Sequence, residues 1–576
     1  MQPLLSIENL SVDFISETEK TEAVKNISLA VHTGEIVALV GESGSGKSVT
    51  SLSILQLLPK PPAHYANGRI LFTEEGKTTD LLRLSNKELQ AIRGHKISMI
   101  FQEPMTSLNP VMACGEQVME ALLAHKQLSK KQAKTQTITW FEKVKLPEPD
   151  KIFSRYPHQI SGGQKQRVMI AMAMCCDPQL LICDEPTTAL DVTVQKTILG
   201  LIKDLQRERN MGVVFITHDL GVVAQIADRI AIMYKGEIVE QGTVQTIFKA
   251  AKHPYTKALI ACRPALHPRG ESLPTVSDYL VEKEPGAGSE ERKSGDQRIT
   301  DQQRATGNGQ QDLRSIVQVQ NLSVLFPART SLFGKPKSFV TAVNNVSLHI
   351  YKGETLGLVG ESGCGKTTLG RTLLRLLEPA SGKIIYSGTD ITQLSKNQVK
   401  RLRKDVQLIF QDPYSSLNPR LTIGAAIAEP MKVAGIEASG KERKKRVMEL
   451  LQKVSLPTST MNRYPHEFSG GQRQRIVIAR ALGLNPDFLV CDESVSALDV
   501  SVQAQVLNLL NDLKKDLGLT LLFISHDLSV VRYMCDRIIV MQAGSLVESG
   551  AAEEVYLRPQ NPYTKALINA VPKITI

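Results

Sequence analysis

The sequence predicts an α/β chain made of two tandem domains, each built on a mainly parallel sheet. Three observations predict this. Five segments of the first half recur in the same order in the second half, short β-branched runs alternate with helical patterns as in βαβ units, and a glycine-rich loop follows a strand in both halves. The length of 576 residues fits two to four domains of roughly 150 residues each.

The repeated segments define the two copies, and repeats of this length are too long for solenoid units. They are IVALVGESGSGKS at 36–48 with TLGLVGESGCGKT at 355–367, ISGGQKQR at 160–167 with FSGGQRQR at 468–475, LLICDEPTTALDVTVQ at 180–195 with FLVCDESVSALDVSVQ at 488–503, VVFITHDL at 213–220 with LLFISHDL at 521–528, and HPYTKALI at 253–260 with NPYTKALI at 561–568. Between the copies, 282–312 holds almost no large apolar residues and cannot bury enough surface to become ordered. We therefore expect a first domain at 1–281, a flexible linker at 282–312 that keeps the copies close together, and a second domain at 313–576.

Composition narrows the class of protein. No apolar run approaches the roughly 18 residues that a membrane-spanning helix needs, and the N-terminus lacks the basic region of a secretory signal. The eight cysteines form no CxxC pair and mostly lie in apolar runs, which disfavours a disulfide framework or zinc module and fits a reducing compartment. The net charge of +11 permits contact with nucleic acid or an anionic membrane but requires neither. We expect a cytosol-facing chain.

The first glycine-rich loop, GESGSGKS, lies between the strand pattern IVALV and the helical pattern VTSLSILQLL. Backbone N–H groups of such a loop and the N-terminus of the following helix attract phosphate. Lys47 is expected to reach the β- and γ-phosphates and the Ser48 hydroxyl to bind Mg²⁺. The alternative is a glycine-rich turn that matches by chance, and two matches, each between a strand and a helix, weigh against it. The expected nucleotide contacts are Gly41, Glu42, Ser43, Gly44, Ser45, Gly46, Lys47, Ser48 and Val49, with Gly360, Glu361, Ser362, Gly363, Cys364, Gly365, Lys366, Thr367 and Thr368 in the second copy.

Carboxylates follow the apolar runs LLIC and FLVC, as expected for buried strands that end at the ligand-binding edge of a sheet. Asp184 and Asp492 are predicted to hold Mg²⁺, while Glu185 and Glu493 are predicted to polarise the attacking water. Cys183 and Cys491 are more plausible as core residues than as ligands.

Histidines and glutamines follow other apolar strands. His218 and His526 suit a contact to the γ-phosphate, although a lone histidine at a strand end is more often a satisfied polar residue. Gln102 and Gln411 precede acidic-proline turns and are candidates for the Mg²⁺ shell.

The SGGQ segments precede long helical patterns, which predicts a second exposed helix N-terminus suited to an anion in each copy. One domain needs a single phosphate-binding site. A second such site in each copy has a function if the two copies face each other. The residues concerned are Ser161, Gly162, Gly163 and Gln164 in the first copy and Ser469, Gly470, Gly471 and Gln472 in the second.

Phosphate loop, glutamine, SGGQ, DE pair, TALD or SALD, and histidine occur in this order twice. This order resembles the ATP-binding subunits of ABC transporters, with two nucleotide-binding domains fused in tandem. The resemblance covers both halves. It implies two P-loop ABC ATPase domains, each with a mainly parallel sheet core, an antiparallel β subdomain and a helical subdomain, and it implies ATP and Mg²⁺ as cofactors.

The resemblance also implies a head-to-tail pairing of the halves, with ATP sandwiched at two composite sites. The first would combine Lys47, Ser48, Gln102, Asp184, Glu185 and His218 with Ser469, Gly471 and Gln472. The second would combine Lys366, Thr367, Gln411, Asp492, Glu493 and His526 with Ser161, Gly163 and Gln164. Asp191 and Asp499 would cross the interface, and both sites are expected to hydrolyse ATP. Adenine is usually held in this family by an aromatic residue ahead of the loop, for which Phe14 and Phe326 are candidates, although both also suit a strand core.

The segments EPMTSLNP, DPYSSLNP and the two PYTKALI tails resemble the oligopeptide/dipeptide/nickel importers. That resemblance implies import of di- or oligopeptides with two membrane-spanning permease subunits, an extracytoplasmic solute-binding protein, and a peripheral position on the cytoplasmic face of the cell (inner) membrane. The alternative is a tandem ABC ATPase of the translation-factor type acting on ribosomes. The polar, Gly-broken linker and the tails favour the importer, and no nucleic-acid partner is expected.

Overall fold

A computed structural model describes residues 2–16, 20–102, 107–188, 190–280, 315–330, 336–437, 439–496 and 498–572. The expected linker at 282–312 lies outside the described residues. The chain divides into two compact units, Met1–Arg263 with Asp499–Val502 and Ala566–Ile576, and Pro264–Leu498 with Gln503–Lys565. Among the described residues no helix is long and apolar enough to cross a bilayer.

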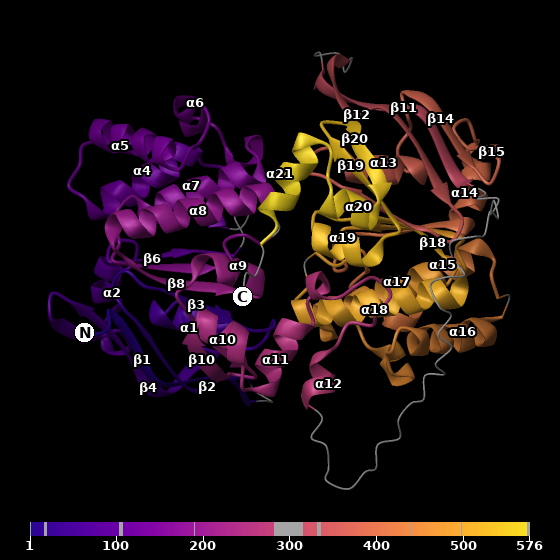
Figure 1. Cartoon of the computed structure of the whole chain (residues 1–576). Coiled ribbons are helices and arrows are strands. Elements are labelled where there is room, and N and C mark those ends of the chain that lie inside the picture. Colours follow the sequence, from indigo (N-terminus) through magenta and orange to yellow (C-terminus); the bar gives the residue numbers. More distant parts are fainter. Residues whose placement is uncertain are drawn as a thin grey trace, which may run out of the picture. The chain divides into compact units, whose positions relative to one another are not determined.

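The first copy of the repeat contains two sheets and a group of helices (Figure 1). Its strands are β1 (Leu5–Ile15), β2 (Lys20–Val31), β3 (Ile36–Val40), β4 (Ala63–Glu74), β5 (Lys77–Asp80), β6 (Ile97–Ile100), β7 (Leu180–Asp184), β8 (Gly212–Thr217), β9 (Arg229–Tyr234) and β10 (Glu237–Thr243). Its helices are α1 (Lys47–Ile54), α2 (Asn86–Ile92), α4 (Cys114–His125), α5 (Lys130–Lys143), α6 (Pro149–Phe153), α7 (Gly162–Met174), α8 (Val192–Arg209), α9 (Leu220–Ile226), α10 (Val244–Ala250) and α11 (Pro254–Ala261), with short 3-10 turns at Leu81–Arg83 and Pro157–Gln159.

The larger sheet of this copy has the order β10-β9-β3-β8-β7-β6, and its strands run parallel except for the β9–β10 pair. The smaller sheet, β2-β1-β4-β5, is antiparallel. Alternate residues of one strand point to opposite faces. In β8, Val213 and Phe215 accordingly join the core shared with α5, α7 and α8, whereas Val214 and Ile216 join the core shared with the smaller sheet. The parallel sheet is therefore the middle layer, as the fold class predicts.

The second copy repeats this plan. Its strands are β11 (Ser315–Thr330), β12 (Pro336–Tyr351), β13 (Thr355–Val359), β14 (Ser381–Tyr386), β15 (Thr389–Asp390), β16 (Val406–Ile409), β17 (Phe488–Asp492), β18 (Thr520–Ile524), β19 (Arg537–Gln542) and β20 (Ser545–Ala551). Its helices are α13 (Lys366–Leu373), α14 (Lys396–Asp405), α15 (Ile423–Ala434), α16 (Gly440–Lys453), α17 (Gly470–Leu482), α18 (Val500–Leu517), α19 (Leu528–Met534), α20 (Ala552–Leu557) and α21 (Pro562–Ala570), with 3-10 turns at Thr458–Asn462 and Pro465–Glu467. The sheet orders, β16-β17-β18-β13-β19-β20 and β12-β11-β14-β15, match those of the first copy strand for strand.

Residues 264–280, which the sequence assigns to the first domain, pack within the second unit. They contain a 3-10 turn (Pro264–Leu266) and α12 (Val276–Leu280). The backbone N–H of Leu273 donates to Oδ1 of Asn508 over 2.8 Å, and Nδ2 of Asn508 donates to the Leu273 carbonyl over 2.7 Å. The Tyr533 hydroxyl donates to the Glu271 carbonyl over 2.6 Å. Leu273 is only 2% exposed, so this segment, 264–280, is an integral part of that unit.

Candidate functional site

The first phosphate loop connects β3 to α1, as predicted. Gly46 has φ +102°, and a Cβ there would lie 2.5 Å from the Ala23 carbonyl oxygen, so the turn into α1 requires glycine. Lys47 is 5% exposed, and its ammonium donates to the carbonyls of Gly41 and Glu42, each over 2.8 Å. Burial lowers the pKa of this lysine. The loop therefore holds its cation against its own carbonyls, at the place where phosphate is expected.

The second phosphate loop, between β13 and α13, has the same geometry. Lys366 donates to the Gly360 carbonyl over 2.8 Å and to the Glu361 carbonyl over 2.9 Å. Cys364 takes the place of Ser45 and is 7% exposed, with its sulfur 3.9 Å from the lysine nitrogen. Burial raises the pKa of this thiol. The two loops differ in chemistry at this one buried position.

Each DE aspartate meets the hydroxyl that follows the loop lysine. The Ser48 hydroxyl donates to Asp184 Oδ1 over 3.2 Å, and the Thr367 hydroxyl donates to Asp492 Oδ1 over 2.9 Å. Burial raises the pKa of both aspartates. Oδ2 of Asp492 is buried without a hydrogen-bond partner among the described residues. A carboxylate oxygen that accepts no hydrogen bond and lies beside a hydroxyl belongs to the kind of oxygen ligand set that Mg²⁺ prefers, so these residues fit that ion.

The second oxygen of each aspartate has a different neighbour in the two copies. In the first copy the Ser51 hydroxyl lies 3.4 Å from Asp184 Oδ2. In the second copy Gly370 occupies the position of Ser51, and Nη2 of Arg371 lies 4.0 Å from Asp492 Oδ2. Arg371 corresponds to Leu52 of the first copy. The two expected metal sites therefore differ by one positive charge.

The glutamate after Asp184 is the centre of a polar cluster at the edge of the sheet. Glu185 meets His218 Nδ1 at 3.3 Å, accepts from the Thr188 hydroxyl over 2.9 Å and accepts from Gln102 Nε2 over 3.3 Å. Its φ of 46° is in the left-handed region, which non-glycine residues rarely occupy and which often marks functional sites. Burial acts to raise the pKa of Glu185, but the hydrogen bond and charge of His218 outweigh it and lower that pKa to about 2. The same pairing raises the pKa of His218 against the effect of burial.

The second copy repeats this cluster with one partner fewer. His526 Nδ1 lies 3.4 Å from Glu493, and Gln411 Nε2 donates to Glu493 over 2.8 Å. The φ of Glu493 is 48°, and its pKa is lowered by His526 in spite of burial. Ser496, at the position of Thr188, donates to the Glu493 backbone carbonyl instead of the carboxylate. Each copy thus presents an ionised glutamate held by a histidine, which is consistent with the predicted role of a water-polarising base.

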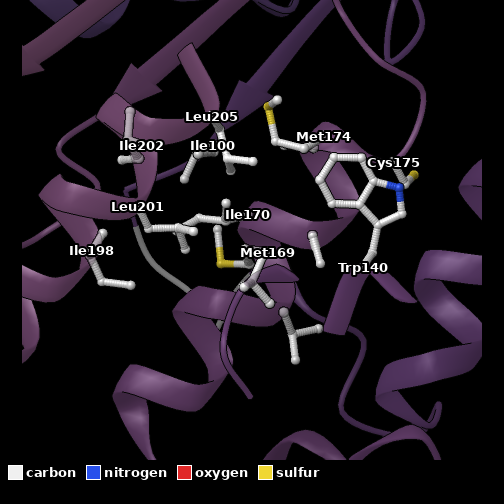
Figure 2. Close-up of a cluster of buried hydrophobic side chains, with 14 of the residues drawn as sticks. Ile100, Trp140, Met169, Ile170, Met174, Cys175, Ile198, Leu201, Ile202 and Leu205 are labelled. Atoms are coloured by element: carbon white, nitrogen blue, oxygen red, sulfur yellow. The ribbon is translucent and has the colours of Figure 1, made fainter. Parts of the chain in front are cut away.

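The SGGQ residues begin helices, as predicted. Ser161 caps α7 by accepting from the Gln164 amide over 3.3 Å, and the Gln164 side chain accepts from the Ser161 amide over 3.0 Å. Ser469 and Gln472 form the same capping box on α17. Figure 2 shows how α7 is anchored: Met169, Ile170 and Met174 pack with Trp140 of α5 and with Ile198, Leu201, Ile202 and Leu205 of α8. Ser161 and Gly162 remain exposed at the N-terminal end of this well-packed helix.

Within each copy the structure thus brings together the predicted lysine, hydroxyl, aspartate, glutamate, glutamine and histidine. The two aromatic candidates differ: Phe14 is half-buried against the core of the smaller sheet, and Phe326 is 38% exposed on β11. Their role stays a prediction. Cys183 and Cys491 are fully buried core residues, as predicted.

Sequence reasoning missed several contacts. Ser51 and Arg371 touch the predicted carboxylates but belong to no recognised motif, and Thr188 of the TALD segment touches Glu185 although no contact was predicted for it. Tyr255 and Tyr563, from the repeated PYTKALI tails, accept hydrogen bonds from the phosphate loops. The repetition of those tails was the signal that could have found the tyrosines.

Comparison with known proteins identifies the family. The family model "ABC transporter" matches residues 24–188 and 343–496, which together exceed half of the chain. The chain belongs to the ABC transporter family. A second family model, "Oligopeptide/dipeptide transporter, C-terminal region", matches residues 239–285 and 547–576 of this ABC protein. The predicted fold class and family are therefore confirmed, and the chain is an ATPase with two ATP-binding cassettes.

Similar curated proteins cover nearly the whole chain. The glutathione import ATP-binding protein GsiA of Salmonella choleraesuis (strain SC-B67) is 48% identical over 571 residues, 99% of this chain and 89% of that protein. GsiA of Escherichia coli O6:H1 is 48% identical over 578 residues, and GsiA of Pectobacterium atrosepticum is 47% identical over 576 residues, with the same coverage. A solved structure of the ATP-binding cassette MJ0796 bound to ADP and Pi is 29% identical, with a TM-score of 0.37 over 41% of this chain and 98% of that one. These comparisons lend no support to the ribosomal alternative.

Proposed function

We propose that this chain powers an ABC importer for small peptides and that glutathione, a tripeptide, is the first solute to test. One observation carries the proposal: both cassettes have a complete set of reactive side chains, and both are followed by a C-terminal region of the oligopeptide/dipeptide transporter type. The identity of 48% to glutathione import proteins over 99% of the chain supports the choice of solute.

In the proposed reaction each cassette binds ATP at its own phosphate loop. Lys47 and Lys366 leave their loop carbonyls to meet phosphate oxygens, and Glu185 and Glu493, ionised and oriented by their histidines, accept a proton from the attacking water. When bound, Mg²⁺ would neutralise phosphate charge, held by Ser48 and Asp184 or by Thr367 and Asp492, with Gln102 and Gln411 beside them.

We further propose that the exposed SGGQ helix ends complete the sites, each helix acting on the nucleotide held by the other cassette. Charge-assisted hydrogen bonds from Ser161 and Ser469 would then favour closure of the two cassettes only while a triphosphate is bound. Hydrolysis would remove that link. A Ser161→Ala, Ser469→Ala variant would still bind ATP, but ATP would no longer favour closure of the two cassettes.

The proposed partners are two membrane-spanning permease subunits and an extracytoplasmic binding protein, which place this chain at the cytoplasmic face of the inner membrane. Exposed aromatic side chains beside the glutamines support a docking surface for the permeases. Phe101 is 38% exposed, Phe410 is 41% exposed and Tyr414 is 54% exposed. Aromatic residues of this kind are enriched at protein interfaces.

The test is uptake of labelled glutathione, dipeptides and oligopeptides by cells lacking this chain. We expect the wild-type chain to restore glutathione uptake and a Glu185→Gln, Glu493→Gln variant to fail while reaching the same expression level. Restoration of dipeptide or oligopeptide uptake alone would keep the importer and reject glutathione. Association with ribosomes, with no effect on uptake of any peptide, would reject the importer.

A further inference from the structure

The repeated tails place one tyrosine against each phosphate loop. Tyr255, in the first turn of α11, is fully buried, and its hydroxyl oxygen accepts a hydrogen bond from the Glu42 backbone N–H over 3.1 Å. Tyr563, in the first turn of α21, accepts from the Glu361 backbone N–H over 3.0 Å. About 210 residues separate each tyrosine from its loop, so only tertiary packing produces the contact.

The glutamate that each tyrosine contacts is also the one that the loop lysine contacts. The Glu42 N–H donates to Tyr255, while the Glu42 carbonyl accepts from Lys47 over 2.8 Å. In the second copy Glu361 is held in the same way, with its carbonyl 2.9 Å from Lys366. The tyrosine therefore fixes the peptide unit at the start of the loop.

A second set of bonds keeps the tyrosine in place. The Glu240 carboxylate of β10 accepts from the backbone N–H groups of Lys252 and His253 over 2.8 and 3.1 Å, just before α11. The Glu548 carboxylate of β20 accepts from Gln560 and Asn561 over 2.7 and 3.1 Å, just before α21. Each tail helix is thus tied to the edge strand of its larger sheet: β10, beside β9, in the first copy and β20, beside β19, in the second.

The surroundings of the two rings differ while the hydroxyl contact stays the same. Tyr255 packs against the Tyr234 ring in a tilted arrangement with ring centroids 4.2 Å apart, whereas Gln542 occupies the matching position in the second copy. The helix caps also differ, with His253 accepting from the Tyr255 N–H in one copy and Asn561 accepting from the Tyr563 N–H in the other. The feature common to both copies is the bond to the loop.

We propose that Tyr255 and Tyr563 are positioning residues for ATP binding, and that the C-terminal helix of each cassette holds its phosphate loop ready for nucleotide. The proposal gives the C-terminal region a role within the cassette. It does not depend on which solute is transported.

The test replaces Tyr563 by Phe, with Tyr533→Phe as the matched control. Both changes remove one tyrosine hydroxyl bonded to backbone in the same unit, but Tyr533 contacts segment 264–280 instead of the loop. Both variants carry Lys47→Ala so that binding reports the second cassette. Losing one neutral hydrogen bond predicts that the Kd for ATP rises about fivefold with Tyr563→Phe. We expect no change in Kd with Tyr533→Phe.

Hydrogen exchange adds a local measurement. Amides of the peptide spanning 355–367 should exchange faster in Tyr563→Phe and at the wild-type rate in Tyr533→Phe. Unchanged affinity and unchanged loop exchange in Tyr563→Phe would overturn the proposal. Equal losses of ATP affinity in both variants, matched by equal falls in Tm, would also overturn it, because they would show general destabilisation. Tyr255→Phe in a Lys366→Ala background repeats the test in the first cassette.

Discussion

Replacement of Glu185 by Gln should move the pKa of His218 from above its ordinary 6.5 to below it. The two side chains are 11% and 20% exposed, and burial alone would raise the pKa of the carboxyl and lower that of the imidazole. Their pairing reverses both effects. The fall in the pKa of Glu185 from 4.5 to about 2 corresponds to about 3 kcal/mol in favour of the ionised carboxylate.

The sign of the pH dependence follows from these directions. Because the pKa of Glu185 is lowered in the folded state, its contribution to the free energy of unfolding is complete above pH 4.5 and is lost as the pH falls towards 2. Because the pKa of His218 is raised in the folded state, its contribution to the free energy of unfolding is complete below pH 6.5 and is lost as the pH rises through the pKa of the folded state. Both describe one interaction, so the energy is counted once. In Glu185→Gln the histidine keeps burial, the largest effect, which lowers its pKa, together with the weaker effects of the Asp499 and Asp219 carboxylates, which raise it.

The assay is an NMR pH titration of protein labelled at histidine Cε1, with the His218 signal assigned from a His218→Gln variant among the 11 histidines. Glu493→Gln is the matched control, since it should lower the pKa of His526 and leave His218 unchanged. The reasoning is refuted if His218 of the wild-type protein titrates at or below 6.5, or if Glu185→Gln does not lower its pKa.

Three further predictions concern the two cassettes. Glu185→Gln and Glu493→Gln should each slow ATP hydrolysis at its own site by roughly 10²- to 10⁴-fold, as measured by phosphate release, and near-normal turnover would remove the proposed role from that cassette. Arg371→Leu should lower the Mg²⁺ concentration needed for fluorescent-ATP binding at the second site by about tenfold, because a guanidinium repels a divalent ion bound to Asp492. Arg371→Lys keeps the charge and should leave that concentration unchanged, and Leu52→Arg should raise it at the first site. An unchanged Mg²⁺ requirement in both Arg371→Leu and Leu52→Arg would contradict the charge argument. N-ethylmaleimide should block nucleotide at the second site preferentially and react slowly at neutral pH because burial raises the pKa of Cys364; equal loss of binding in Cys364→Ser would show that another group is modified.

The polar side chains of the candidate site could be predicted from the sequence because each follows an apolar run that is recognisable as a strand. Gln102, Asp184 and His218 lie at or just after the ends of β6, β7 and β8, which are adjacent parallel strands. Strand ends on one edge of a parallel sheet meet, so three separate motifs indicate one cluster. The SGGQ helices were predictable for a similar reason, since a serine cap with a glutamine three residues later signals a helix start.

The remaining contacts depend on tertiary packing that no spacing encodes. The repetition of the PYTKALI tail marks its tyrosine as a residue of interest, but it does not indicate which distant loop the tyrosine contacts. Arg371 and Ser51 are single positions on helices whose neighbours are unremarkable, and they matter only because α13 and α1 point them at an aspartate. The packing of 264–280 was equally hidden, because its apolar residues are few and its partners Asn508 and Tyr533 lie far along the chain.

That packing has a practical consequence for work on the separate halves. A recombinant N-terminal fragment ending near residue 281 would carry Leu273 and Val276, which are 2% and 9% exposed in the whole chain, without the surface that covers them. Such a fragment would expose these apolar side chains to solvent and would tend to associate through them. A C-terminal fragment starting near residue 313 would lack the strip that shields Asn508 and Tyr533. Cutting after Arg263 instead keeps segment 264–280 together with its partners Asn508 and Tyr533.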